Sequence, residues 1–286
     1  MRIARFVLKS DAHRQPRLGV VDGEGVRDVT DVTQAMPPLR WPLSPGDALI
    51  AHLDVLRPQM QAMAARQPLV ARDDVHFLSP VANPGKLVCG VGNWSHHQAP
   101  LGMLGFLVKA TSSLAGEAEG VQLRWPDRTT VHEPELAIVI GRTCVNVTPE
   151  EALSHVAGYT CGLDMTLKEE REFFCFCKSF DTYGVLGPHL VTADEIDDPS
   201  ALSYQFRVNG ELRGERSFRD LTGSPAQLVA FASSAMTLHP GDVILCGAAD
   251  VAPVAAGDVM HFEIAQIGRL QVGVSVSPHA RGRPSA

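Results

Sequence analysis

Short apolar runs separated by glycine, proline and polar residues dominate the chain from about residue 86 onward. Runs of about four to eight apolar or alternating residues bounded by turn signals are typical of β-strands. The runs are KLVCGVG, GFLVKA, ELAIVIG, GYTCGLDM, HLVT, YQFRVNG, DVILCG, DVMHFEIA and LQVGVSV. We therefore expect a strand in each of them.

Helix starts interrupt these strands at TPEE (residues 148–151) and SPAQ (residues 224–227). Each begins with a hydroxyl residue, continues with proline at the first helical position, and has Glu or Gln at the third, which is the pattern of a capping box. Many strands, few helices and no regular strand-helix alternation indicate a β-rich α+β fold rather than a doubly wound parallel sheet.

The first part of the chain, residues 1–78, reads as a small N-terminal α/β domain. MRIARFVL and RLGVVDG predict strands, and SPGD at residues 44–47 predicts the start of a helix that Pro58 should end or kink. The stretch SPVANPG at residues 79–85 marks a domain boundary. We expect a second, catalytic domain over residues 79–286.

Composition narrows the classes of protein that the chain can belong to. Of 286 residues, 45% are hydrophobic and 20% charged, and the formal net charge is −7. No clustered Lys/Arg stripe is present, so a nucleic-acid partner is not expected, and no apolar run reaches membrane-spanning length. The first residues lack the apolar run of a signal peptide. We expect a cytoplasmic protein with a small-molecule substrate. We expect its cysteines to be buried and to act as small apolar residues.

Three carboxylates stand where apolar residues are expected. Glu133 and Glu135 lie two positions apart before the run LAIVIG, and Asp164 ends the run GYTCGL. Period-two alternation puts both glutamates on one strand face, where they repel each other unless a cation lies between them. On spacing alone, solvent-facing glutamates at a strand edge are the commoner interpretation. As a metal site, the three would hold Mg²⁺ or Mn²⁺, with Ca²⁺ as the other hard ion that carboxylates bind.

Ordered motifs over about residues 86–276 resemble the fumarylacetoacetate hydrolase family. They are VGNWSHH (91–97), FLVKATSS (106–113), EPELAIVIG (133–141), KSFDT (178–182), LGP (186–188), VNGE (208–211) and LHPGDVI (238–244). The resemblance is to the branch that contains acylpyruvate and fumarylpyruvate hydrolases and 2-hydroxyhepta-2,4-diene-1,7-dioate isomerases. It implies a mixed β-sandwich roll, a homodimer, and a metal held by the three carboxylates.

The resemblance also implies roles for other residues. Lys178 would stabilise a developing oxyanion or enolate, with a surface lysine as the alternative. Thr182 would bond water or substrate, or else stabilise a turn. Asn93, Lys109 and Lys168 would contact the substrate. Many members of the family carry Arg at the position of Lys168, and lysine cannot hold a carboxylate through two parallel bonds as arginine does.

The lid motif departs from the family pattern. His97 stands at the position of the family's lid histidine, but Pro100 replaces the glutamate that assists it in activating water. Without that carboxylate the hydrolytic pair is incomplete. His96 is a second candidate, and both histidines are alternatively solvent-exposed lid residues. The sequence GAAD at residues 247–250 also replaces the family's Gly-Thr-Pro loop, which indicates an unusual pocket.

Three functions follow. The first is a divalent-metal-dependent hydrolase that cleaves a carbon–carbon bond of a 2,4-dioxo acid, of the acylpyruvate or fumarylpyruvate kind met in aromatic catabolism, through a metal-stabilised enolate. The second is a metal-dependent isomerase or decarboxylase of a 2-oxo or 2-hydroxy-dienoic acid, which the replacement by Pro100 favours. The third is a catalytically weakened protein that binds a 2-oxo acid without converting it.

Overall fold

The structure is a computed structural model that describes residues 1–97, 100–101, 105–168 and 174–282. Its largest element is a sheet of 12 strands in the order β4-β3-β2-β1-β14-β12-β11-β17-β6-β7, with β5 paired to β1 and β8 to β14. Its strands are β1 (Arg2–Leu8), β2 (Arg17–Asp22), β3 (Gly25–Asp28), β4 (Leu69–Ala71), β5 (Val75–Leu78), β6 (Leu87–Gly90), β7 (Phe106–Lys109), β8 (Leu114–Ala115), β11 (Pro134–Ile140), β12 (Val156–Asp164), β14 (Gly184–Thr192) and β17 (Val243–Leu245).

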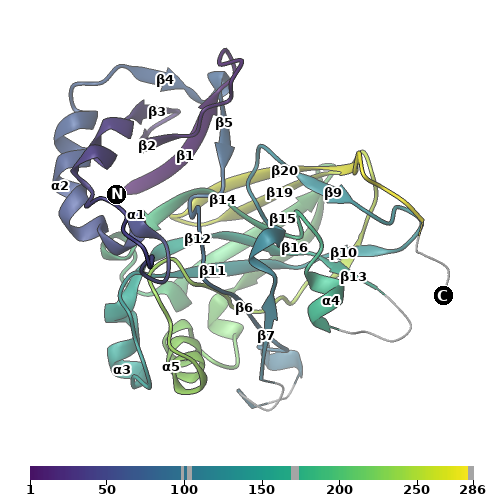
Figure 1. The fold of residues 1–286 in the computed structure, drawn as a ribbon. Coiled ribbons are helices and arrows are strands. Elements are labelled where there is room, and N and C mark those ends of the chain that lie inside the picture. Colours follow the sequence, from purple (N-terminus) through teal and green to yellow (C-terminus); the bar gives the residue numbers. More distant parts are fainter. Residues whose placement is uncertain (98–99, 102–104, 169–173, 283–286) are drawn as a thin grey trace.

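Smaller sheets lie beside it, as Figure 1 shows. The sheet of 5 strands contains, in order, β16 (Glu211–Ser217), β15 (Ser203–Val208), β19 (Val259–Ile264), β20 (Gly268–Val276) and β9 (Val121–Leu123). The sheet of 3 strands contains β13 (Thr166–Leu167), β10 (Thr130–His132) and β18 (Ala252–Val254). Each predicted apolar run contains a strand, so the predicted β-rich α+β fold is confirmed.

The helices are short, and α2 (Leu53–Ala64) packs against a face of the large sheet, whose residues share a core with it (Figure 1). The α-helices are α1 (Ala48–Ala51), α2 (Leu53–Ala64), α3 (Pro149–Ala152), α4 (Phe174–Lys178) and α5 (Pro225–Ala235). The 3-10 helices are η1 (Thr30–Ala35), η2 (Arg72–Asp74), η3 (Ser95–His97), η4 (Thr111–Ser113), η5 (Leu153–His155), η6 (Ala193–Glu195), η7 (Pro199–Ala201) and η8 (Phe218–Asp220). In the described part of the chain no helix is long and apolar enough to cross a membrane.

Both predicted capping boxes are present. In α5, Gln227 N donates to Ser224 Oγ at 3.3 Å and Ser224 N donates to Gln227 Oε1 at 2.9 Å. In α3, the side chain of Thr148 and that of Glu151 make the corresponding pair of bonds. These reciprocal bonds satisfy backbone donors that the first helical turn leaves without partners.

The helix predicted from residue 44 differs in the structure. Asp47, not Ser44, is the N-cap residue, and its carboxylate accepts from the amides of Leu49 and Ile50. The break between α1 and α2 falls at His52, and α2 continues through Pro58. Proline removes one helical hydrogen bond, but Pro58 and Asp54 are both exposed, so water can satisfy the Asp54 carbonyl. The prediction that the helix ends at Pro58 was wrong.

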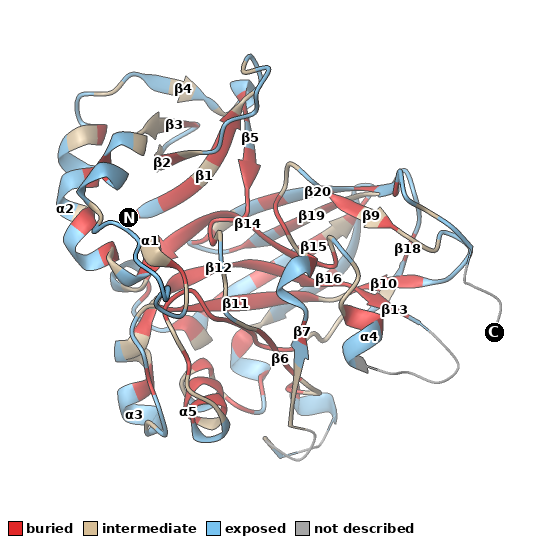
Figure 2. Cartoon of the chain, viewed as in Figure 1, coloured by how far each residue is buried: buried red, intermediate tan, exposed pale blue. Residues whose placement is uncertain are grey.

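Strand β11 lies at the centre of the large sheet, between β12 and β17, and is buried along its whole length (Figure 2). Leu136, Ile138 and Ile140 point into a core shared with the sheet of 5 strands, whereas Ala137 and Val139 point into a core shared with α2. Burial on both faces explains why this strand is a continuous apolar run rather than an alternating one.

The N-terminal strands continue the large sheet, because β1 pairs with β14 at Arg2↔Val191 and Ile3↔Leu190. Asp47 strengthens this connection, since its Oδ2 accepts from the amides of Ala82 and Asn83 within the proposed boundary stretch. Whether residues 1–78 form a separate domain stays a prediction.

Candidate metal centre

Neighbouring strands bring the three carboxylates together. In the antiparallel pair of β11 and β12, Pro134 faces Leu163 and Glu135 faces Gly162, so Asp164 at the end of β12 lies level with Glu133. The amide of Asp164 donates to the carbonyl of Glu133 at 2.9 Å. One carboxylate oxygen from each of Glu133, Glu135 and Asp164 lies within 4.8 Å of the others.

Burial makes this concentration of negative charge unfavourable. Glu135 and Asp164 are each 1% exposed. Burial, together with repulsion from Asp164 and Glu133, raises the pKa of Glu135 well above its usual range. Burial alone would also raise the pKa of Asp164, but the ammonium groups of Lys109 and Lys178 outweigh it and hold that pKa below its usual range.

A divalent cation fits this arrangement. A hard cation takes carboxylate oxygen at about 2.0 to 2.6 Å, so two oxygens on one ion lie at most about 5 Å apart. The three carboxylate oxygens, which lie within 4.8 Å of one another, satisfy that limit. A cation would also remove the repulsion that raises the pKa of Glu135. The donor set, three carboxylates without thiol or imidazole, favours Mg²⁺, Mn²⁺ or Ca²⁺.

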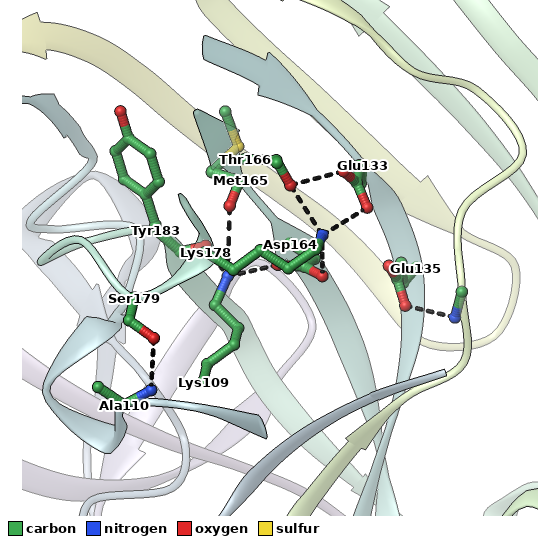
Figure 3. A network of polar contacts seen from close by, with 11 residues as sticks. Lys109, Ala110, Glu133, Glu135, Asp164, Met165, Thr166, Lys178, Ser179 and Tyr183 are labelled. Carbon is green, nitrogen blue, oxygen red and sulfur yellow. Dashed lines mark hydrogen bonds and ion pairs between the residues drawn. The ribbon is translucent and has the colours of Figure 1, made fainter. Parts of the chain in front are cut away.

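Lys178, from the end of α4, reaches into this cluster of carboxylates (Figure 3). Its Nζ lies 2.9 Å from Glu133 Oε2 and 2.7 Å from Asp164 Oδ2, and donates to Thr166 Oγ1 at 2.7 Å. Burial alone would lower the pKa of Lys178, but the carboxylates of Asp164 and Glu133 reverse this and raise it. Lys178 is therefore a fixed positive charge beside the candidate metal ligands.

Thr166 belongs to the same network, although the sequence did not single it out. Its hydroxyl donates to Glu133 Oε1 at 2.6 Å while it accepts from Lys178. Its position in the sequence could have indicated this role. Thr166, in β13, lies two residues after Asp164, and in an extended chain side chains two residues apart point to the same face.

Lys109 approaches the other oxygen of Asp164 (Figure 3). Its ammonium donates to Asp164 Oδ1, to the Tyr183 carbonyl at 2.7 Å and to the Met165 carbonyl at 3.4 Å. The residue is 1% exposed. All three ammonium protons thus have partners inside the protein, so the geometry supports a part in holding Asp164 rather than the predicted contact with substrate.

Asn93 is likewise buried and used internally. Its Nδ2 donates to the carbonyls of Gly223 at 3.0 Å and Cys246 at 2.9 Å, and its Oδ1 accepts from the Gly223 amide at 2.7 Å. Both amide protons are thereby occupied, which leaves the predicted contact with substrate without a free donor.

Thr182 and Lys168, the other predicted substrate contacts, lie outside the network of carboxylates and lysines. Thr182 Oγ1 accepts from the amide of Gln122 at 2.8 Å, and the residue has a positive φ of 67°. The hydroxyl therefore connects this turn to β9 (Val121–Leu123). Lys168 is exposed and its amide donates to the Thr129 carbonyl at 2.8 Å. It directly precedes residues 169–173, which lie outside the described residues.

The lid histidines lie on η3, after β6. His96 and His97 are both exposed, with ring centroids 4.1 Å apart. Partial burial and the proximity of His96 lower the pKa of His97. Within the described residues neither imidazole hydrogen-bonds to Glu133, Glu135 or Asp164.

Glu135 has a backbone partner that the sequence did not indicate. The amide of Gly247, in the loop after β17, donates to Glu135 Oε2. Gly247 has a φ of 98°, and a Cβ there would lie 2.9 Å from the Gly90 carbonyl oxygen. Only glycine lets this backbone approach the carboxylate without strain.

The chain is similar to known proteins over most of its length. Residues 82–275 match the family described as Fumarylacetoacetate (FAA) hydrolase C-terminal. A maleylpyruvate hydrolase of Aquipseudomonas alcaligenes is 43% identical over 96% of this chain and 99% of its own. The crystal structure of maleylpyruvate hydrolase from Sphingobium sp. SYK-6 in complex with manganese(II) ion and pyruvate has a TM-score of 0.83 and 36% identity, covering 97% of this chain and all of that one. A mitochondrial oxaloacetate tautomerase of Xenopus laevis is 30% identical over 94% of this chain and 89% of its own.

Proposed function

The chain belongs to the fumarylacetoacetate hydrolase family, and from that premise we propose that it is a divalent-metal-dependent hydrolase of a 2,4-dioxo acid. The observation that carries the proposal is the meeting of Glu133, Glu135 and Asp164 with the ammonium group of Lys178. The three carboxylates bind the cation, and Lys178 supplies a fixed positive charge beside it.

We propose an acylpyruvate with a second carboxylate, such as maleylpyruvate or fumarylpyruvate, as the substrate. Two similar proteins are maleylpyruvate hydrolases, and one of them was solved with pyruvate. In the reaction the oxygen of water bonds to the C4 carbonyl carbon, and the C3–C4 bond breaks. The electron pair of that bond stays on C3, which takes a proton and becomes the methyl group of pyruvate, while C4 becomes a carboxylate.

The proposed cation is Mn²⁺ or Mg²⁺, with Ca²⁺ as the other hard ion of suitable chemistry. When bound, a divalent cation polarises carbonyl oxygens of the substrate and favours negative charge on them. Glu133, Glu135 and Asp164 hold it, while Thr166 and Lys109 orient Glu133 and Asp164. Such outer partners fix the direction of ligand oxygens, which makes them part of the site although they touch no substrate.

Lys178 has the geometry to stabilise charge that develops on the substrate. Its Nζ lies within 2.9 Å of the carboxylates of Glu133 and Asp164, two of the proposed metal ligands, so a substrate bound at the cation would lie close to this ammonium group. Because its raised pKa keeps it protonated, Lys178 acts as an electrostatic partner and not as a base.

We propose His97 as the residue that accepts a proton from the attacking water, with His96 as the alternative. Its lowered pKa keeps the imidazole neutral near pH 7, as a base requires. Pro100, however, stands where the family resemblance implies a glutamate, so this position supplies no carboxylate to the imidazole.

That replacement favours a second candidate, a metal-dependent isomerase, tautomerase or decarboxylase of a related 2-oxo acid. It needs no hydrolytic water and therefore no assisted base, and the tautomerase of Xenopus laevis is a relative named for chemistry of this kind. A protein that binds without turnover is the third possibility. We further propose that the protein works in the cytoplasm as a homodimer, in the catabolism of aromatic compounds.

The experiment follows the enol absorbance of an acylpyruvate with purified protein and Mn²⁺ or Mg²⁺, with EDTA as control and products identified by NMR. Metal-dependent loss of absorbance that yields pyruvate and the free acid supports hydrolysis. Release of CO₂ or a shifted double bond supports the second candidate. Absence of turnover with maleylpyruvate, fumarylpyruvate and simple acylpyruvates contradicts the hydrolase.

A further inference from the structure

Three segments that are distant in the sequence meet behind Glu135. They are residues 93–94 at the base of the lid, residues 221–223 before α5, and residues 246–247 after β17. Asn93 joins them by its side-chain bonds to Gly223 and Cys246. Its carbonyl also accepts from the amide of Thr222 at 3.2 Å.

Trp94 extends this connection to the metal centre. Its indole Nε1 donates to the Gly247 carbonyl at 2.7 Å, and the Gly247 amide in turn donates to Glu135 Oε2. The indole is 1% exposed and packs against Tyr204 and Phe218, with ring centroids 6.3 and 6.1 Å away. Removal of one partner of a buried hydrogen bond leaves the other partner unsatisfied, which is unfavourable.

The Gly247 residue has little freedom to take another position. A Cβ on it would lie 3.1 Å from Asn93 Cβ and 2.9 Å from the Gly90 carbonyl oxygen, so its backbone packs tightly against the strand end and the lid base. The direction of its amide, and hence the hydrogen bond to Glu135, depends on where Asn93 and Trp94 hold it.

We infer that Asn93 and Trp94 form a clamp that positions the Gly247 amide and thereby orients the Glu135 carboxylate for the cation. The clamp is defined as these two side chains together with the residues that they bond, Gly223, Cys246 and Gly247. The inference rests on the proposed function, because it takes Glu135 as a metal ligand. Trp94 is a positioning residue, since it acts through Gly247 and touches neither cation nor substrate.

The clamp also connects the lid to the metal centre. The 3-10 helix η3 (Ser95–His97), which carries His96 and His97, follows Trp94, and the His97 amide donates to the Trp94 carbonyl at 2.9 Å. Displacement of Trp94 therefore moves both the lid base and the Gly247 peptide. This arrangement fixes the position of the first residues of the lid relative to Glu135.

The test replaces Trp94 by Phe and measures binding of Mn²⁺ alone by calorimetry. Phe keeps most of the ring packing but lacks the N–H donor, so we expect a Kd for Mn²⁺ about 10-fold higher, as for other changes to residues behind a metal ligand. Turnover should recover at saturating Mn²⁺. Trp41→Phe makes the same chemical change at a residue that is 90% exposed, and should leave the Kd unchanged.

Phe218→Leu separates the hydrogen bond from the packing. It disturbs the aromatic cluster of Trp94, Tyr204 and Phe218 without removing the indole donor. We expect it to lower the unfolding temperature of the metal-free protein while the Kd for Mn²⁺ stays at the wild-type value. If Phe218→Leu weakens Mn²⁺ binding as much as Trp94→Phe does, packing explains the effect and the clamp is overturned.

Glu135→Gln distinguishes failure of the clamp from failure of the proposed function. If Glu135→Gln loses Mn²⁺ affinity but Trp94→Phe binds as the wild type does, the metal centre stands and the clamp is rejected. If Glu135→Gln binds Mn²⁺ unchanged, Glu135 is not a ligand, and the proposed metal centre falls together with the clamp.

Discussion

The carboxylate cluster and the lid histidines belong to one proposed site but differ in almost every physical respect. Glu135 and Asp164 are buried on the central strands of the large sheet, and each makes hydrogen bonds that fix its oxygens. His96 and His97 are exposed on a 3-10 helix of three residues. Strand pairing fixes the positions of the carboxylates, whereas few contacts hold the two histidines in place.

This difference indicates that the fold positions the groups for metal binding more firmly than the groups for proton transfer. The carboxylates are held by the register of β11 and β12 and by two buried lysines, so cation binding is built into the core. A histidine on an exposed segment needs a partner to orient it, and Pro100 supplies none. Substitutions in the core should therefore act on metal binding and turnover together, and those in the lid on turnover alone.

Asp164→Asn should have the largest effect. The substitution removes one of three anionic ligands and leaves Lys109 and Lys178 facing the cation, so we expect Mn²⁺ binding to be lost and turnover to fall about 1000-fold or more. Calorimetry and the absorbance assay measure the two effects, and circular dichroism checks folding. Asp181→Ala, which removes an exposed carboxylate from the same region, is the control. Mn²⁺ affinity retained in Asp164→Asn would exclude the ligand assignment.

The carboxylate cluster also shows how far sequence reasoning reaches. Period-two alternation was enough to place Glu133 and Glu135 together, and the apolar runs predicted their strands. The partners Lys109, Thr166 and Gly247 were not predicted as such, because they come from β7, β13 and the loop after β17. Only tertiary pairing between segments distant in sequence brings them to the carboxylates.

The sequence motifs also did not indicate that Asn93 and Lys109 are buried. Asn93 and Lys109 were expected at the substrate, yet both lie inside the protein with their donors occupied. A sequence motif records that a residue type is present but not which of its neighbours it bonds. That information requires the positions of Cys246 and Tyr183, which are far away along the chain.

Lys178→Met should separate the two properties that Asp164→Asn removes together. Met has a similar length but no charge, so turnover should fall between about 100- and 1000-fold, as when a group that stabilises an oxyanion is lost. Mn²⁺ affinity should be kept or increased, because the Lys178 ammonium no longer competes for the oxygens of Glu133 and Asp164. Calorimetry with the absorbance assay tests this split. An unchanged rate would show that Lys178 is only a structural ion pair.

His97→Ala tests the lid region. If His97 accepts the proton from water, we expect hydrolysis to fall about 100-fold, at the low end for general-base catalysis, while Mn²⁺ affinity stays unchanged. His96→Ala, compared in the same assay, decides between the two imidazoles, and His13→Ala is an exposed control far along the chain. Full hydrolytic activity in both lid variants would favour the isomerase or decarboxylase.

Pro100→Glu should have the smallest effect on turnover. It tests most directly the contrast between the carboxylate cluster and the lid histidines. His97 must be neutral to accept a proton, so the rate falls as pH drops through its pKa. In the wild type, burial and the neighbouring His96 lower that pKa, so the fall should lie below the ordinary histidine range. A carboxylate three positions on would favour the charged imidazole and move the fall to higher pH.

The same carboxylate would orient the imidazole, so the rate above this pKa should rise by less than about 10-fold. The pH profile of kcat/KM for wild type and Pro100→Glu measures both changes, and Pro100→Gln separates charge from removal of proline. A faster Pro100→Glu enzyme with a shifted profile would show that His97 lacks an orienting carboxylate in the wild type and that one substitution supplies it. The carboxylate cluster, by contrast, already has its partners. An identical profile in both variants would place the catalytic base elsewhere than His97.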